Sequence, residues 1–144
     1  MGELDRQLLA ERSMSVERHL TRVADRLPGD VSAFGPSTDA ADAVILHLWQ
    51  AVQVVIDLAV TACLRFDLGA PQGYADAFRR LQQGGLLEAA LADRLVRATG
   101  FRNVVAHAYD TLDMARVHLA ATEGPADLRA FLAALGRHLP AESA

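Results

Sequence analysis

One short window of the chain gathers more proton-transfer and phosphate-binding groups than any other. Between Gly100 and Asp110 the sequence reads GFRNVVAHAYD, in which an arginine, an amide, an imidazole and a phenol interrupt an apolar helical pattern. A guanidinium offers phosphate a planar fork of donors, and an imidazole exchanges a proton near neutral pH. The window therefore suits phosphodiester chemistry, with Arg102 and His107 as the candidate reactive pair.

Helical geometry predicts which of these side chains can meet. At about 100° per residue, Asn103 and His107 lie about 40° apart on one face, whereas Arg102 and Tyr109 lie about 20° apart on a second face. The second face is roughly 140° from the imidazole, so the long arginine side chain must reach round the helix. Arg102 and His107 can therefore act on one substrate only if the arginine side chain extends round the helix toward the imidazole.

Metal-free cleavage of RNA needs a base, an acid and positive charge at the phosphorus. One histidine cannot fill both proton roles at once. A two-fold dimer built on this helix would bring His107 and Arg102 of both protomers to one cleft, and we therefore expect a homodimer.

Other interpretations of the polar groups remain open. Arg102, Asn103 and His107 could form a buried polar network that fixes helix packing. A metal site is conceivable but matches no recognised spacing; its ligands would be His107, Asp110, Asp113 and His118. Asp57 lies on an apolar helix, where a buried carboxylate needs a partner, and we expect it to orient Arg102 or His107.

The elements that position the window are predicted to be helices. Apolar residues recur at helical spacing, aromatic residues make up only 6% of the chain, and Gly–Pro breaks separate the periodic segments. The 144 residues predict one domain spanning 1–144, an all-α antiparallel bundle of five to six helices. The predicted helices are 3–27, 39–67, 74–83, 86–109, 113–121 and a last one starting at Gly124.

Charge and composition exclude several function classes. The net charge of −4 leaves no broad basic field, so nucleic acid would be held by a local arginine cluster. A lone cysteine, Cys63, and a start without a signal-peptide pattern favour a reducing, cytoplasmic location. The most apolar stretch, 43–64, contains polar residues that would be costly in lipid, so we expect a core helix and no membrane partner.

The order of motifs resembles one known family. Arg102, then His107 five positions later, then Tyr109 reads as the Arg-x-x-x-x-His-x-Tyr signature of HepT-like toxins in the HEPN superfamily. The segments IDLA at 56–59, YADAFRRL at 74–81 before Gly84-Gly85, and GFRN at 100–103 are similar to the family in the same order. The resemblance implies an all-helical, metal-independent endoribonuclease without a cofactor, which dimerises around the motif and pairs with an MntA-type nucleotidyltransferase antitoxin.

The resemblance also implies roles for single residues. Arg102 and His107 become the catalytic pair, Asn103 a supporting polar group of the catalytic site, and Tyr109 the residue that the antitoxin modifies with AMP. Such a modification would add negative charge and bulk near Arg102, in competition with RNA phosphate. The expected partners are RNA, a second copy of the chain or a higher oligomer, and the antitoxin. The alternative is a non-catalytic helical module that serves the nucleotidyltransferase as substrate or scaffold.

Overall fold

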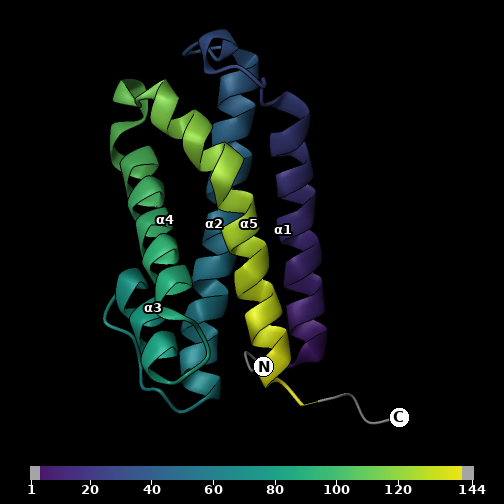
Figure 1. Ribbon diagram of the computed structural model, residues 1–144, viewed down its shortest axis with the longest axis vertical. Coiled ribbons are helices and arrows are strands. Elements are labelled where there is room, and N and C mark those ends of the chain that lie inside the picture. The colour runs from purple at the N-terminus through teal and green to yellow at the C-terminus, as the bar shows by residue number, and fades with distance from the viewer. Residues whose placement is uncertain (1–3, 141–144) are drawn as a thin grey trace.

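Helices account for all the regular secondary structure of residues 4–140, the part of the chain that the computed structural model describes (Figure 1). The predicted all-α class is therefore confirmed for these residues. Five α-helices and two short 3-10 turns follow one another in this order: α1 Arg6–Arg26, η1 Val31–Ala33, α2 Asp39–Arg65, α3 Tyr74–Gln83, α4 Ala89–Ala108, η2 Tyr109–Thr111 and α5 Met114–His138.

Side-chain caps begin three of the five α-helices. The Asp5 carboxylate accepts from the backbone N–H of Leu8 at 2.8 Å and starts α1. The Thr38 hydroxyl accepts from Ala41 N–H at 3.1 Å and starts α2, one residue before the predicted helix 39–67 begins. Such caps satisfy backbone donors that the first helical turn leaves without partners.

The central helix α2 organises the bundle. It packs against α1, α3, α4 and α5, and α5 runs obliquely across it (Figure 1). It is long and apolar enough to cross a membrane by length and composition, yet half of its most apolar window is buried against the other helices. That pattern is typical of a bundle's core helix, as the sequence predicted.

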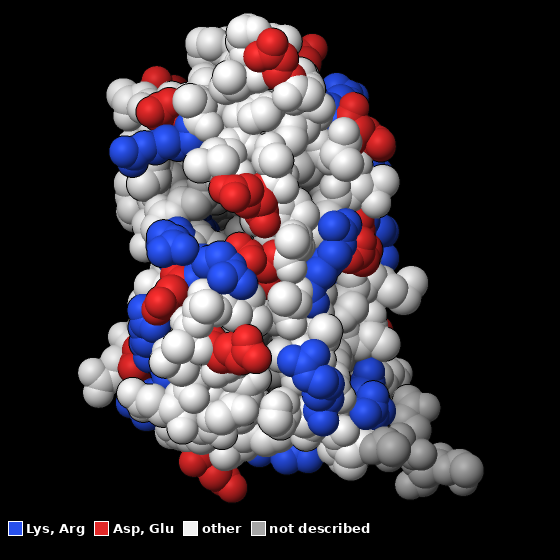
Figure 2. All heavy atoms as spheres, in the orientation of Figure 1, with Lys and Arg blue, Asp and Glu red and all other residues white. Residues whose placement is uncertain are grey.

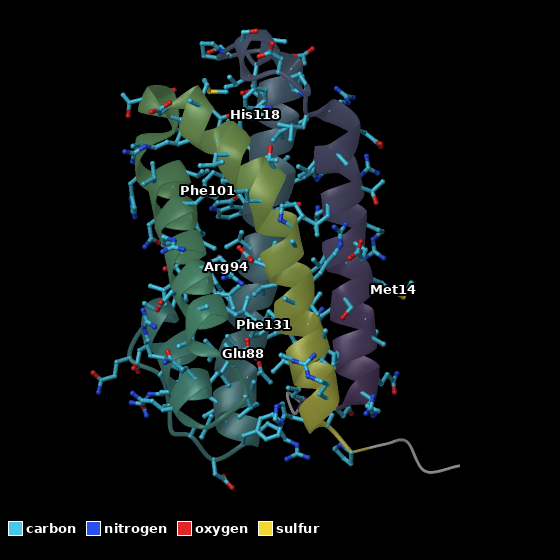
Figure 3. All side chains as sticks on the ribbon, in the orientation of Figure 1. Met14, Glu88, Arg94, Phe101, His118 and Phe131 are labelled. Atoms are coloured by element: carbon cyan, nitrogen blue, oxygen red, sulfur yellow. The ribbon has the colours of Figure 1, made fainter. Side chains whose placement is uncertain are left out.

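Aromatic packing joins α3 to α5 beneath the surface. The rings of Phe78 and Phe131 meet edge to face with centroids 5.7 Å apart, and both side chains are fully buried. Figure 3 shows Phe131 directed into the bundle, whereas Met14 points away from α1 into solvent. Nearby, the buried Cys63 thiol donates to the Ala77 carbonyl at 3.4 Å, and burial raises the pKa of this thiol.

The last helix differs from the prediction. A short helix at 113–121 followed by a new helix at Gly124 was expected, but α5 is continuous from Met114 to His138 with Pro125 inside it. Proline removes one backbone donor and opposes a helix interior. Here the residues on both sides of Pro125 are buried in the same core, and this shared packing outweighs the missing hydrogen bond. The buried residues are Val117, Ala121, Leu128, Phe131, Leu132, Ala134 and Leu135.

Ion pairs tie α5 to its neighbours at the surface. Arg94 on α4 pairs with Asp127 on α5 at 2.8 Å, and Arg129 on α5 pairs with Glu17 on α1 at 2.8 Å. Figure 2 shows basic and acidic side chains interspersed over this face of the molecule. Exposed pairs of this kind contribute little each, so the apolar core carries most of the stability.

Candidate active site

The end of α4 presents the polar window because its other face is fixed to the core. Phe101 and Val105, one turn apart, pack against the hydrophobic core (Phe101 is labelled in Figure 3). Residues at the intervening helical positions must then face outward. Asn103 and His107 are accordingly exposed on one face, as predicted, and the buried polar network is not formed by these two side chains.

Arg102 is held by side chains from two other helices. Its Nε donates to Gln53 Oε1 on α2 at 2.9 Å, and its Nη1 reaches Asn103 Oδ1 at 3.4 Å. Its guanidinium carbon lies 5.5 Å from the centroid of the Trp49 ring and 5.4 Å from that of the Tyr74 ring. Two aromatic faces and one amide therefore fix the guanidinium without neutralising it.

No carboxylate of residues 4–140 lies within 4.0 Å of this guanidinium. Arginine has five N–H donors in a planar fork, and only those on Nε and Nη1 have side-chain partners here. The remaining donors can bind an incoming anion. A positioned, uncompensated guanidinium is the group that stabilises charge developing on a phosphate.

Asp57 contacts Arg102 only indirectly. The prediction of a buried carboxylate paired with Arg102 or His107 is wrong, because Asp57 is exposed and accepts from Gln53 Nε2 at 3.0 Å. Gln53 in turn accepts from Arg102, so the order is carboxylate, amide, guanidinium. The reason is that α2 is not buried all round and Asp57 lies on its open side. Asp57 can still orient Arg102 through the amide.

His107 is open to solvent. Its ring makes no hydrogen bond to another side chain or to the backbone within the part of the chain that the structure describes. An imidazole without an internal partner keeps both ring nitrogens for an outside group. It lies one turn beyond Asn103, whose amide oxygen contacts Arg102, and so the three candidate residues of α4 form one continuous polar surface.

Tyr109 lies just outside α4, as the first residue of η2. Its hydroxyl donates to Asp42 Oδ1 on α2 at 2.5 Å, and 43% of the side chain is exposed. The hydrogen bond to Asp42 is the main cause that raises the pKa of Tyr109 to about 12, followed by burial and by the charges of Asp42 and Asp110. Arg102 and Tyr109 both turn toward α2, but their partners there are eleven positions, about 16 Å, apart.

The conceivable metal ligands are not brought together. No group of three or more His, Cys, Asp or Glu within residues 4–140 is arranged to hold a metal ion. His118 instead contacts the Pro28 carbonyl oxygen at 2.7 Å, and Asp113 caps α5 through Ala115 N–H. His118 and Asp113, two of the conceivable ligands, therefore make contacts that stabilise the fold.

The fold and this site define a HEPN-type helical protein. A chain from a crystal structure of a toxin–antitoxin with AMP-PNP superposes with a TM-score of 0.84 and 26% identity, covering 92% of this chain and 100% of that chain. The tri-AMPylated HEPN toxin of Shewanella oneidensis, solved in complex with its MNT antitoxin, gives a TM-score of 0.82 and 27% identity, covering 90% and 97%.

The chain belongs to the ribonuclease HepT-like family, whose sequence model matches residues 16–135. The mRNA nuclease HepT of Shewanella oneidensis is 30% identical over 107 residues, which cover 74% of this chain and 80% of that protein. The chain is therefore a ribonuclease of the HepT type, as its resemblance implied. This assignment favours the ribonuclease over the non-catalytic alternative.

Four residues that surround the window were not singled out from the sequence. They are Asp42, Trp49, Gln53 and Tyr74. Trp49, Gln53 and Asp57 recur every four residues on α2, so one stripe of that helix carries three of the groups behind Arg102. The four-residue spacing could have shown from the sequence that these side chains share one face of α2. It could not have shown that this face packs against α4.

Proposed function

We propose that this HepT-type ribonuclease cleaves RNA without a metal ion, at a site shared by two copies of the chain. The observation that carries the proposal is the Arg102 guanidinium, which is fixed between two aromatic rings, lacks a carboxylate partner among residues 4–140 and adjoins the open His107 surface. This combination suits binding and charge stabilisation at a phosphodiester.

The chemistry requires two imidazoles. One His107 removes the proton of a ribose 2′-hydroxyl, whose oxygen attacks the adjacent phosphorus. The bond from phosphorus to the 5′-oxygen breaks, and His107 of the second protomer gives that oxygen a proton. Arg102 stabilises the charge on the non-bridging oxygens during the transfer. The products are a 2′,3′-cyclic phosphate and a free 5′-hydroxyl, and Asn103 helps to hold the phosphate.

A nucleotidyltransferase antitoxin inhibits this nuclease in the cytoplasm by adding AMP to Tyr109. Support comes from the Shewanella oneidensis toxin, which is similar in fold and was solved tri-AMPylated and bound to its MNT antitoxin. Tyr109 is accessible and follows the catalytic helix directly. Because Tyr109 and Arg102 contact α2 about 16 Å apart, a chain of several AMP groups, as on the Shewanella oneidensis toxin, would be needed to bring phosphates into competition with RNA for Arg102.

Cleavage by the purified protein tests the catalytic part. RNA should be cut in the presence of EDTA and end in a 2′,3′-cyclic phosphate. Arg102→Ala and His107→Ala should each lose at least about a hundredfold in rate, the usual scale for a proton-transfer or charge-stabilising group. Arg97→Ala, an exposed arginine of the same helix, is the matched control and should cleave normally. Full cleavage by the Arg102 and His107 variants would refute the proposed chemistry.

Mixed dimers test whether two protomers share the site. A dimer of one wild-type and one His107→Ala protomer, isolated with two different tags, should be nearly inactive if both imidazoles are needed. Half of the wild-type rate would instead show that each chain works alone. The wild-type rate should also follow a bell-shaped pH profile, and a flat profile from about pH 5 to 9 would contradict an acid–base pair.

Intact-mass measurement tests the modification. Incubation with the cognate nucleotidyltransferase and ATP should add one or more AMP groups to the wild type and none to Tyr109→Phe. The chain has only one other tyrosine, so Tyr74→Phe is the matched control and should still be modified. Modification of Tyr109→Phe at the wild-type level would place the acceptor elsewhere.

A further inference from the structure

A second cationic cleft lies on the other flank of α2, between that helix and α1. The cleft has a volume of about 180 Å³ and is lined by Arg22, Asp25 and Arg26 of α1 and by Ala43 and His47 of α2. Neither arginine takes part in the proposed cleavage chemistry. Both are exposed, so an outside ligand can reach them.

The charges of this cleft are not balanced from within the protein. No carboxylate of residues 4–140 lies within 4.0 Å of Arg22 or Arg26, whereas Arg94 and Arg129 on the face of α5 have close acidic partners. With two guanidinium groups and the single carboxylate of Asp25, the lining keeps an excess of one positive charge. A site of this composition favours an anion with several acceptor oxygens.

His47, which lines the cleft, is paired with a second histidine, His19, which is not among the lining residues. The Nδ1 atoms of His19 on α1 and His47 on α2 are 3.0 Å apart, so one ring must donate and the other accept. Burial is the first cause that lowers the pKa of both rings, and nearby positive charges, Arg22 among them, lower it further. If His19 donates, His47 must carry its proton on Nε2 and has a donor to offer to a ligand in the cleft. His19 is then a positioning residue that selects the tautomer of His47.

The cleft and the Arg102 site lie on two sides of one exposed ridge. Leu46 on α2 is 49% exposed. By helical geometry His47 is turned about 100° to one side of Leu46, and Trp49, beneath Arg102, about 60° to the other. These two directions differ by about 160°, so a strand that contacts both sites has to pass over the exposed Leu46 side of α2.

We propose that Arg22, Arg26 and His47 bind a backbone phosphate of the RNA strand, farther along the strand from the phosphate that is cut at Arg102 and His107. The inference rests on the proposed function for the identity of the strand, and it adds a phosphate subsite remote from the reacting atoms. The subsite supplies binding without sequence readout, because it recognises only phosphate. It also fits a protein whose net charge of −4 gives no general attraction for RNA.

Binding of an RNA that cannot be cut tests the subsite apart from catalysis. The probe is a short single-stranded RNA, 2′-O-methylated at every ribose and followed by fluorescence anisotropy. Arg22→Gln/Arg26→Gln should weaken binding by about tenfold or more, the equivalent of removing one hydrogen bond to a charged group. The slope of log affinity against log salt should fall by about 0.7 for each phosphate that the variant no longer binds.

Arg12→Gln/Arg137→Gln is the matched control. It removes the same two charges from exposed positions outside the cleft, so the net charge changes from −4 to −4 − 2 = −6 in both variants. The control should bind RNA nearly as the wild type does. Equal weakening of both variants, or no weakening of the Arg22/Arg26 variant, would overturn the subsite. Because the probe is not cleaved, this result is independent of whether the catalytic proposal holds.

Nitrogen-detected NMR of the histidine rings gives a second, direct measurement. Titration with the same RNA should shift the resonances of His47 and His19, and inorganic phosphate alone should do so only weakly, since it occupies the cleft without the rest of the strand. His19→Asn keeps a donor near the Nδ1 position and should preserve RNA affinity, whereas His19→Phe should lower it. Unchanged His47 resonances at saturating RNA would refute binding of the strand in the cleft.

Discussion

Replacement of Asp42 by alanine should return the phenol of Tyr109 toward the pKa of an ordinary tyrosine. In the wild type the hydrogen bond to Asp42, at 2.5 Å, is the largest cause of a pKa of about 12. Burial and the charge of Asp110 persist in the variant, so we expect the pKa to fall to between about 10 and 11. Asp42→Asn keeps an acceptor but removes the charge and should give an intermediate value.

Ultraviolet titration of tyrosinate absorbance measures this change. The background should be Tyr74→Phe, so that Tyr109 is the only tyrosine in the chain. Unfolding has to be followed in parallel by circular dichroism, because the titration extends to alkaline pH. If Asp42→Ala gave the same titration curve as the protein with Asp42, the hydrogen bond between Tyr109 of η2 and Asp42 of α2 would be refuted.

The same hydrogen bond has a consequence for stability against pH. The folded-state pKa lies above the unfolded value of about 10, so the folded protein binds the phenol proton more tightly. The stabilisation is complete below about pH 10 and disappears as the pH rises through about 12. The wild type should therefore lose more stability across this window than Asp42→Ala does.

Four further substitutions test the packing around the site. Gln53→Leu should lower the cleavage rate by about tenfold, because the Nε donor of Arg102 loses its acceptor while the guanidinium remains; an unchanged rate would contradict the positioning role. Trp49→Phe should keep an aromatic face under Arg102 and therefore most of the activity. The substitution also removes a buried indole N–H that has no partner among the described residues, so urea titration should show little loss of stability. Gly100→Ala should stabilise α4 by about 0.5–1 kcal/mol in thermal unfolding, since no atom beyond its neighbours and the local helix backbone lies within 4 Å of the added Cβ. A loss of activity without a loss of stability would show that another molecule packs there. Phe131→Ala should cost about 3–5 kcal/mol in urea unfolding, and a cost below about 1 kcal/mol would contradict its place in the core.

The bounds of a helix could be predicted where residues within that helix, and not its packing against others, decide where it begins and ends. Tyr74–Gln83 matches the predicted 74–83 because two glycines end it and its buried side chains, Phe78 and Leu81, lie three positions apart. The break at Gly124-Pro125 was predicted and does not occur, because local turn chemistry favours a stop while burial on both sides of Pro125 favours one helix. Only the packed structure shows that the second effect is larger.

The site was predictable in part for the same reason. Asn103 and His107 share one face of α4, and their spacing alone predicted this; Arg102 lies on a second face and reaches Asn103 with its long side chain, as the sequence also required. Trp49, Gln53 and Tyr74 come from α2 and α3, and their contacts with Arg102 depend on how these helices pack against α4. Asp57 was misjudged because the apolar sequence around it hides the open side of α2.

The guanidinium of Arg6 fastens the start of α1 to the end of α5 through the carbonyls of Gly136, Leu139 and Pro140. Both ends of the described chain thus meet at one pole of the bundle, and Figure 1 shows η2 at the opposite pole. A fluorophore or surface anchor attached at Asp5 or Pro140, the exposed residues near this pole, would lie far from Tyr109. The protein can therefore be immobilised through Asp5 or Pro140 for single-molecule work with RNA or the antitoxin while the pole that carries Tyr109 stays accessible.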